Sequence, residues 1–263
     1  MAKKRADILL VEKRLAENVR EATAMLMAGE VIINHQKITT PGTMIDVTAR
    51  INVKSKIPYV SRGGFKLAAA LDAFNVNPSN KICADVGAST GGFTDVLLQR
   101  GAKKVYAIDV GYGDLAWKIR QDPRVVVMER TNARKVERLP DKVALVVVDA
   151  SFISLKLILP TATKWVEPKA AFITLVKPQF EAKKELVEKG GVVRKKSIHA
   201  VVLKNIIAWC HTHQLTVVNL IVSPIVGPAG NKEFLLYSVF ETSKQIVPDS
   251  DLVDRCLQPL DYS

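Results

Sequence analysis

The sequence has little cysteine, few aromatic residues and no pattern of metal ligands. Three cysteines and 6% aromatic residues occur among 263 residues. Cys83, Cys210 and Cys256 lie far apart in the chain, which does not suit a disulfide framework and favours a reducing compartment such as the cytoplasm. No group of cysteine and histidine residues has metal-ligand spacing, so we expect no metal site.

A membrane-spanning segment is also missing from the sequence. No stretch approaches the ~18 apolar residues that a spanning helix needs. The short apolar run near the N-terminus is interrupted by Glu12, Lys13 and Arg14, which argues against a signal peptide. We therefore expect no stable insertion into a membrane. The sequence leaves the oligomeric state open.

Acidic residues are in deficit, since 26 Asp and Glu stand against 38 Lys and Arg, for a formal net charge of +12. A solvated surface accounts for part of this excess. An excess this large more often indicates a polyanionic partner, either nucleic acid or an anionic membrane. Charge alone does not distinguish the two.

The first sixty residues form a pattern of their own. Residues 6–17 carry apolar side chains at mainly helical spacing. Asn18 precedes Glu21 by three residues, which predicts the start of a second helix. Short strands are expected over residues 31–34 and 37–40. Two helices and a small sheet within so few residues predict a compact α+β module.

This module resembles the small RNA-binding domain of ribosomal protein S-four, pseudouridine synthases and tyrosyl-tRNA synthetases. The resemblance lies in "LLVEKRLAENVREATAMLMAGEVIINHQKITTPG". It implies an RNA-binding domain over residues 1–58, with Arg14, Arg20 and Lys37 on or near the RNA face. The alternative is a helical cap with solvated charges; the domain-length pattern and the basic excess together favour RNA binding.

After a connector at residues 59–65, apolar strands alternate with helices. The connector contains Arg62 in a flexible Arg-Gly-Gly sequence, and we count Arg62 among the RNA contacts. Near-continuous apolar strands alternating with helices predict a mostly parallel sheet covered on both faces. Two further strands between residues 215 and 241, joined by a Pro/Gly loop, suit an antiparallel pair at one edge. The strands are expected within residues 82–88, 104–110, 125–129, 144–150 and 171–176.

A glycine-rich turn, "DVGASTGGFTD", follows the first strand of this sheet. Such sheets bind ligands at the carboxyl ends of their strands. Gly87, Gly91 and Gly92 let the backbone approach a ligand closely, and the next helix directs its amide groups and positive dipole end at the site. Asp109 ends the following strand, where a carboxylate can accept hydrogen bonds from both ribose hydroxyls.

The spacing of these glycines distinguishes two classes of cofactor. It does not match the G-x-G-x-x-G sequence that places a pyrophosphate, although NAD remains possible on the turn alone. S-adenosylmethionine has no phosphate, and its sulfonium and amino-acid end suit nearby carboxylates such as Asp85. Asn132 could read adenine or only form a turn. The expected cofactor-binding residues are Asp85, Gly87, Ser89, Gly91, Gly92, Phe93, Asp109, Asn132 and Asp149.

Four charged residues lie where the sheet would bring them together: Lys66, Asp149, Lys177 and Glu233. Lys177 closes an apolar strand and is followed by proline, which is unusual. It could extend to solvent as a surface lysine. It could instead be partly desolvated beside a second lysine, an arrangement that suits proton removal.

Six motifs together closely resemble the TlyA family of ribosomal RNA methyltransferases, many of them labelled haemolysin A. The motifs are "DVGASTGGFTD", "DVGYGDLAW", "ERTNAR", "VVVDASFISL", "LVKPQFE" and "GPAGNKEF". The resemblance covers essentially the whole chain. It implies an α/β, Rossmann-like class I methyltransferase fold of the FtsJ type, with a mostly parallel seven-stranded sheet and an antiparallel edge strand, over residues 66–245. Residues 246–263 are then expected to be a C-terminal tail.

The same resemblance implies a catalytic tetrad of Lys66, Asp149, Lys177 and Glu233. The implied reaction is methyl transfer from S-adenosylmethionine to the 2′-hydroxyl of a cytidine in ribosomal RNA, within ribosomal subunits. A ribose hydroxyl is a poor nucleophile and needs a positioned base, a role that we expect Lys177 to take. Methylation at carbon five of cytosine needs a cysteine nucleophile near the fourth strand, and none of the three cysteines lies there. Exocyclic amine methylation usually shows a D/N-P-P-F/Y turn after that strand, and the sequence has "DASF" instead.

The sequence disfavours three other functions. A membrane-active haemolysin is disfavoured because the sequence shows no signal peptide, spanning run or long basic amphipathic helix. An RNA-binding protein without catalysis is disfavoured by the intact tetrad, and an NAD-dependent oxidoreductase by the glycine spacing.

A basic segment follows Lys177 in the sequence. It is either a solvated face or a mobile RNA-contacting loop, whose phosphate contacts would be sensitive to salt. Its expected RNA contacts are Lys183, Lys184 and Arg194.

Overall fold

The computed structural model describes residues 2–53, 58–241 and 251–260. The chain divides into two compact units, Met1–Pro58 and Tyr59–Ser263. Each unit has its own apolar core, so each is described by itself.

The first unit is built from two helices and short strands. Strand β1 pairs antiparallel with β4, and β2 pairs antiparallel with β3 and β5. Asn18 caps α2 as predicted, because its Oδ1 accepts a hydrogen bond from the Glu21 amide at 2.9 Å. Leu10, Leu26 and Val31 are fully buried between the helices and the sheet. The elements are β1 (Lys3–Arg5), α1 (Ala6–Glu12), α2 (Val19–Met27), β2 (Val31–Ile33), β3 (Gln36–Ile38), β4 (Met44–Asp46) and β5 (Ile51–Val53).

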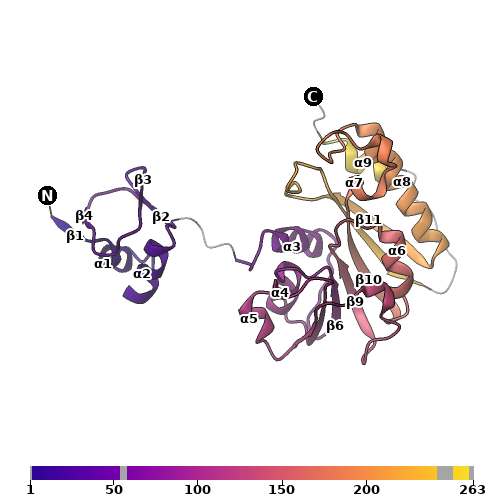
Figure 1. Ribbon diagram of the computed structural model, residues 1–263, viewed down its shortest axis with the longest axis horizontal. Helices are drawn as coiled ribbons and strands as arrows, with labels where there is room; N and C mark the ends of the chain where they lie inside the picture. Colours follow the sequence, from indigo (N-terminus) through magenta and orange to yellow (C-terminus); the bar gives the residue numbers. More distant parts are fainter. Residues whose placement is uncertain (1, 54–57, 242–250, 261–263) are drawn as a thin grey trace. The chain divides into compact units, whose positions relative to one another are not determined.

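The second unit is a three-layer α/β fold around one seven-stranded sheet, with strand order β11-β12-β10-β9-β6-β7-β8. One apolar core cluster packs α3 and α4 against one face, and another packs α6, α8 and α9 against the other (Figure 1). The strands are β6 (Ile82–Val86), β7 (Lys104–Ile108), β8 (Val125–Met128), β9 (Val143–Val148), β10 (Val166–Val176), β11 (Leu215–Val222) and β12 (Phe234–Phe240). The helices are α3 (Gly63–Ala73), α4 (Gly92–Gln99), α5 (Trp117–Arg120), η1 (Ala133–Lys135), α6 (Leu155–Ala162), α7 (Pro178–Glu181), η2 (Lys184–Leu186), α8 (Lys196–Thr212) and α9 (Leu252–Leu257).

The predicted mostly parallel, seven-stranded sheet is confirmed. Strands β8, β7, β6, β9 and β10 run parallel, and β12 runs antiparallel to both of its neighbours. The expected antiparallel pair at one edge is confirmed as β11 and β12; β11 occupies the edge, and β12, one position in, is the strand that runs against the other strands of the sheet. Strands such as β9 are buried on both faces, with Val146, Val147 and Val148 fully enclosed. Such strands are continuous apolar runs in the sequence, which is why they could be predicted.

Two expected boundaries differ from the structure. The expected connector at residues 59–65 is partly helical, since Gly63 begins α3. The Tyr59 ring packs directly on Gly64, where a Cβ would lie only 2.3 Å from the ring. This contact anchors Tyr59 against the start of α3. The expected tail also contains a packed helix: α9 buries Leu252, Val253, Cys256 and Leu257 in the core of the second unit. Residues 246–250 and 261–263 of that tail lie outside the described residues.

Candidate active site

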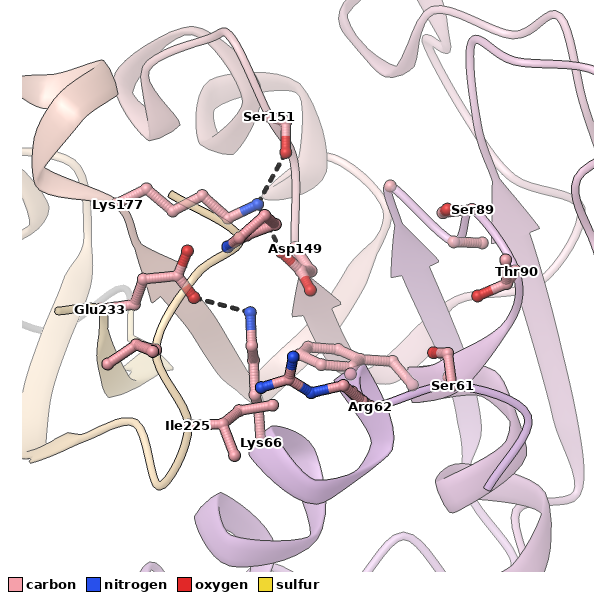
Figure 2. Close-up of a pocket in the computed structure, with 17 residues that line it drawn as sticks. Ser61, Arg62, Lys66, Ser89, Thr90, Asp149, Ser151, Lys177, Ile225 and Glu233 are labelled. Atoms are coloured by element: carbon pink, nitrogen blue, oxygen red, sulfur yellow. Dashed lines mark hydrogen bonds and ion pairs between the residues drawn. The ribbon is translucent and has the colours of Figure 1, made fainter. Parts of the chain in front are cut away.

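Polar side chains gather at the carboxyl ends of β6, β9 and β10. Asp149 follows β9, Lys177 follows β10, and Glu233 stands immediately before β12. Lys66 lies in the first turn of α3. Figure 2 shows the four side chains pointing toward one another across a pocket. The strand order explains their meeting, since β9, β10 and β12 are consecutive in the sheet.

The four charged groups form two ion pairs. Lys177 Nζ lies 2.6 Å from Asp149 Oδ1, and Lys66 Nζ lies 2.6 Å from Glu233 Oε2. Lys177 Nζ also donates to Ser151 Oγ at 2.8 Å. Lys66 and Lys177 are each 7% exposed and Glu233 is 2% exposed. Buried charges of this kind are tolerated only when they are paired, so removing one partner leaves the other charge uncompensated.

Two adjacent cavities meet at this place. The first has a volume of about 440 Å³ and is lined by all four charged residues. The second has a volume of about 380 Å³ and is lined by Asp109 and Asn132. The lining residues that both cavities share are Gly87, Ser89, Asp149 and Ser151. A ligand with one end in each cavity would therefore pass over the glycine turn.

The glycine turn is shaped by two close approaches. Gly87 has a φ of 83°, and a Cβ there would lie 2.8 Å from the backbone oxygen of Asp149. Gly91 has a φ of 92° and begins α4 from the left-handed region. Neither conformation suits an ordinary side chain. The turn is closed by Asp109, whose carboxylate accepts hydrogen bonds from the amides of Ser89 and Gly111, each at 2.7 Å.

Asp85, which was expected among the cofactor-binding residues, lines neither cavity. It is fully buried in β6, beneath the turn. Its Oδ2 accepts a hydrogen bond from Thr94 Oγ1 at 2.7 Å, and its Oδ1 has no hydrogen-bond partner among the described residues. Burial, with smaller contributions from the charges of Asp149 and Asp109, raises the pKa of Asp85 to about 7, although the Thr94 hydrogen bond opposes the shift.

Most of the remaining expected cofactor residues line one of the two cavities. Ser89, Gly92 and Phe93 line the first, and Asn132 lines the second. Gly91, like Asp85, lines neither. Asn132 also caps η1, because its Oδ1 accepts from the Arg134 amide at 3.1 Å. The turn-forming and ligand-facing interpretations of Asn132 are thus compatible.

Several lining residues were not singled out from the sequence. Ile225, Val226 and Pro228 come from the loop between β11 and β12, and Ser61 comes from the segment before α3. The Pro/Gly-rich composition of the loop just before Glu233 was the available signal. Ser151 lies two residues after Asp149, but its bond to Lys177 joins residues far apart in sequence.

The expected RNA contacts are exposed basic residues. Arg14, Arg20 and Lys37 lie on the first unit, while Lys183, Lys184 and Arg194 lie on the second. Arg194 pairs with Glu188 at 2.5 Å; exposed pairs of this kind contribute little free energy and exchange partners readily. Arg62 is exposed and lines the first cavity. The other six line neither cavity.

The three cysteines are not nucleophiles. All three are free and buried, and burial raises the pKa of each thiol to about 12, so they stay protonated near neutrality. Within the part of the chain that the structure describes, no group of three or more His, Cys, Asp or Glu is arranged to hold a metal ion. Within the same part, no helix is long and apolar enough to cross a membrane.

Comparison with known proteins matches each of the two units to a protein family. Residues 59–240 match the FtsJ-like methyltransferases, and residues 4–51 match the S4 domain. The chain is 43% identical over 251 residues to a 16S/23S rRNA (cytidine-2′-O)-methyltransferase TlyA of Mycobacterium tuberculosis, covering 92% of each protein. It is 41% identical to Hemolysin A of Brachyspira hyodysenteriae over 89% of this chain and 99% of that protein. A solved candidate hemolysin of Streptococcus thermophilus aligns with a TM-score of 0.76 and 41% identity, covering 98% of this chain and 95% of that one.

Proposed function

The chain belongs to the FtsJ-like methyltransferases and carries an S4 domain, and from that premise we propose that it transfers a methyl group from S-adenosylmethionine to the 2′-hydroxyl of a cytidine in ribosomal RNA. The single observation that carries the proposal is the pair of buried ion pairs, Lys177 with Asp149 and Lys66 with Glu233, in one cavity. The relative from Mycobacterium tuberculosis has this activity by name.

The two cavities fit S-adenosylmethionine, which supplies an electrophilic methyl group when bound. Asp109 is placed to accept hydrogen bonds from the ribose hydroxyls, and the Asn132 amide lies in the same cavity for the adenine. The glycine turn leaves room for the backbone to approach the rest of the cofactor. Asp85 acts from beneath, since a buried carboxyl near this turn favours a cationic ligand above it.

Lys177 is the proposed base. Asp149 and Ser151 accept two of its hydrogen bonds, which leaves one position of the nitrogen for the substrate. In its neutral form this nitrogen would take the proton of the 2′-hydroxyl as the methyl group passes from the cofactor sulfur to the ribose oxygen, leaving S-adenosylhomocysteine. Lys66 and Glu233 hold the opposite wall of the cavity and orient the ribose. Fixing the hydroxyl in line with the methyl group supplies much of the acceleration.

The substrate is recognised by basic residues on both units. We propose residues 1–58 as an RNA-binding domain in which Arg14, Arg20 and Lys37 contact phosphates. Lys183, Lys184, Arg194 and Arg62 contact RNA beside the catalytic cavity. The net charge of +12 supports a polyanionic partner. We infer a cytoplasmic location, where ribosomal subunits are assembled.

The test uses purified protein, tritiated S-adenosylmethionine and isolated ribosomal subunits. We expect tritium in the RNA, and after alkaline hydrolysis we expect it in a resistant dinucleotide, because a 2′-O-methyl group blocks cleavage of the adjacent phosphodiester. Label on a base, or no label with either subunit, would contradict the proposal. A Lys177→Ala protein in parallel controls for contaminating methyltransferases.

A further inference from the structure

The side chain of Asn231 joins two loops that flank the active site. Asn231 lies two residues before Glu233 and is only 2% exposed. Its Oδ1 accepts a hydrogen bond from the Val193 amide at 2.9 Å, and its Nδ2 donates to the Gly191 oxygen at 2.9 Å. These partners are 38 and 40 residues away in the sequence. The contact therefore fixes one loop against the other.

The two hydrogen bonds require an amide at position 231. A backbone N–H can only donate and a backbone C=O can only accept. The Asn231 side chain offers one acceptor and one donor group in the order that Val193 and Gly191 need. A carboxylate would keep the first bond but place an oxygen against the Gly191 carbonyl. An alanine would leave the amide of buried Val193 without its partner, which is costly in a protein interior.

The loop that Asn231 holds is basic. Glu188 and Val192 form an isolated antiparallel bridge around Gly190 and Gly191, which have φ values of 89° and 76°. Lys189, Arg194 and Lys195 of this loop are exposed. Because Val193 is 1% exposed, the loop is anchored at one buried point and presents its charges around it.

The loop that carries Asn231 also shapes the position of Glu233. The Gly227 amide donates to the backbone carbonyl oxygen of Asn231 at 2.9 Å, and the Ser223 amide donates to the backbone carbonyl oxygen of Glu233 at 2.8 Å. A Cβ on Gly227 would lie 2.6 Å from Glu233 Oε1, so the loop backbone closes tightly over this carboxylate. A displacement of Asn231 therefore moves the group that pairs with Lys66.

We propose that Asn231 is a positioning residue that sets the basic loop at residues 188–195 and the carboxylate of Glu233 as one unit. RNA phosphates bound by the basic loop are then held at a fixed place relative to the Lys66–Glu233 pair, where the target ribose is oriented. The inference rests on the proposed methyl transfer to RNA. It assigns to Asn231 a role in both RNA binding and the catalytic step, although its side chain contacts neither cavity.

The test compares Asn231→Ala and Asn231→Asp with the wild type in steady-state methylation of ribosomal subunits. We expect Asn231→Ala to raise KM for the subunits and to lower kcat, with kcat/KM falling about 100-fold, because small displacements of positioned groups cost this much. Asn231→Asp keeps the hydrogen bond from the Val193 amide, so its kcat/KM should lie between those of the wild type and Asn231→Ala. The affinity for S-adenosylhomocysteine, measured by calorimetry, should stay within about twofold of wild type, because the cofactor cavities do not include this residue.

Asn219→Ala is the matched control. Asn219 lies on β11 of the same hairpin, and its Oδ1 accepts a local hydrogen bond from the Leu220 amide at 2.8 Å. It should leave kcat and KM unchanged. A purely structural role for Asn231 would lower the fraction of folded enzyme, and with it kcat and cofactor-binding stoichiometry, but not KM.

A double-mutant cycle with Lys189→Ala tests the coupling directly. In wild type, Lys189→Ala should raise KM for the subunits; in the Asn231→Ala background the further increase should be small, because residues that act as a unit are not additive. Additive effects, or an unchanged KM in both Asn231 variants, would overturn the inference. Should the alanine variant fail to fold, the isosteric aspartate variant decides alone. A wild-type enzyme that methylates no ribosomal RNA would instead refute the proposed function.

Discussion

At the scale of single residues, the site depends on how buried charges are paired. Lys66 and Lys177 are almost fully enclosed, and each has one carboxylate at 2.6 Å. We propose that the pairing separates two roles: Lys66 with Glu233 supplies a fixed wall, while Lys177, held by two acceptors, takes the proton of the substrate hydroxyl. Asp85 is buried beneath the glycine turn, and its Oδ1 has no hydrogen-bond partner among the described residues.

Substituting Lys177 separates proton removal from charge. Lys177→Ala should reduce methyl transfer by about 10²–10⁴-fold, the usual contribution of a general base, while cofactor affinity stays near wild type. Lys177→Arg keeps the cation and should be equally inactive, because a guanidinium does not lose its proton in proteins. Single-turnover transfer of tritiated methyl groups measures the rate. Exposed Lys164 provides the control substitution, and wild-type transfer by Lys177→Arg would remove Lys177 as the base.

Asp85 predicts a pH dependence of stability. The folded-state pKa of about 7 lies above 3.8, the ordinary pKa of an aspartate side chain, so between these values the folded protein keeps a proton that the unfolded chain has lost. The contribution of Asp85 to the free energy of unfolding therefore falls as pH rises from about 4 to 7. Asp85→Asn removes this dependence. Urea unfolding at pH 5 and pH 7.5 measures the free energy of unfolding of both proteins. The stability of Asp85→Asn relative to wild type should be greater at pH 7.5 than at pH 5. A stability difference between the two proteins that does not change with pH would refute this.

At the scale of elements, the turn between β6 and α4 determines the shape of both cavities. Gly87 lies in the lining of each, and its backbone approaches the end of β9 at Asp149. The turn thus fixes the distance between the end of β6 and the residue that follows β9, Asp149. A side chain at Gly87 would push these two strand ends apart.

Gly87→Ala should therefore displace Asp149, in addition to straining the backbone at position 87. Gly113 is a matched control, because it has a φ of 82° but a Cβ there would meet nothing within 4 Å. Each substitution costs about 1–3 kcal/mol of conformational strain, but only Gly87→Ala also displaces Asp149. We expect both variants to lose similar thermal stability from strain, and only Gly87→Ala to lose cofactor affinity in calorimetry. Equal cofactor affinities would contradict this.

The sequence predicted the elements well where the pattern was local. Apolar strands such as β9, the cap at Asn18 and the alternation of strands and helices are confirmed, because each depends on neighbours in the chain. The resemblance to a family identified the four charged residues, and the structure brings them together; their roles stay a prediction. Asp85 is buried in β6 and lines neither cavity, which the sequence did not predict, and its role toward the cofactor stays a prediction.

Contacts between distant segments could not be predicted. The bonds of Asn231 to Val193 and Gly191 cross 38 and 40 residues, and no local pattern distinguishes this asparagine from one in an ordinary turn. Helix α9 was missed for a related reason. Its six residues are too few to show a clear period, and its apolar side chains are explained only by the surface they cover.

At the scale of the whole molecule, the chain combines two units with separate cores. The four charged residues and both cavities belong to the second unit. The first unit carries the S4 match and exposed basic residues. Catalysis and part of the RNA affinity should therefore be separable.

Removing residues 1–58 tests this separation. The remaining chain, Tyr59–Ser263, should fold, because its core does not use the first unit, and should bind S-adenosylhomocysteine as the full chain does. Its affinity for ribosomal subunits should fall, and the slope of log affinity against log salt should become shallower, since each lost phosphate contact reduces that slope by about 0.9 for duplex nucleic acid. An unchanged salt slope would show that the first unit makes no phosphate contacts.

The most direct test of the central claim is a map of 2′-O-methylation on ribosomal RNA from cells with and without the gene for this protein. The account predicts that methylation is lost at one or more cytidines, that it returns with the wild-type gene, and that it does not return with the Lys177→Ala gene. Identical methylation maps with and without the gene would contradict the account.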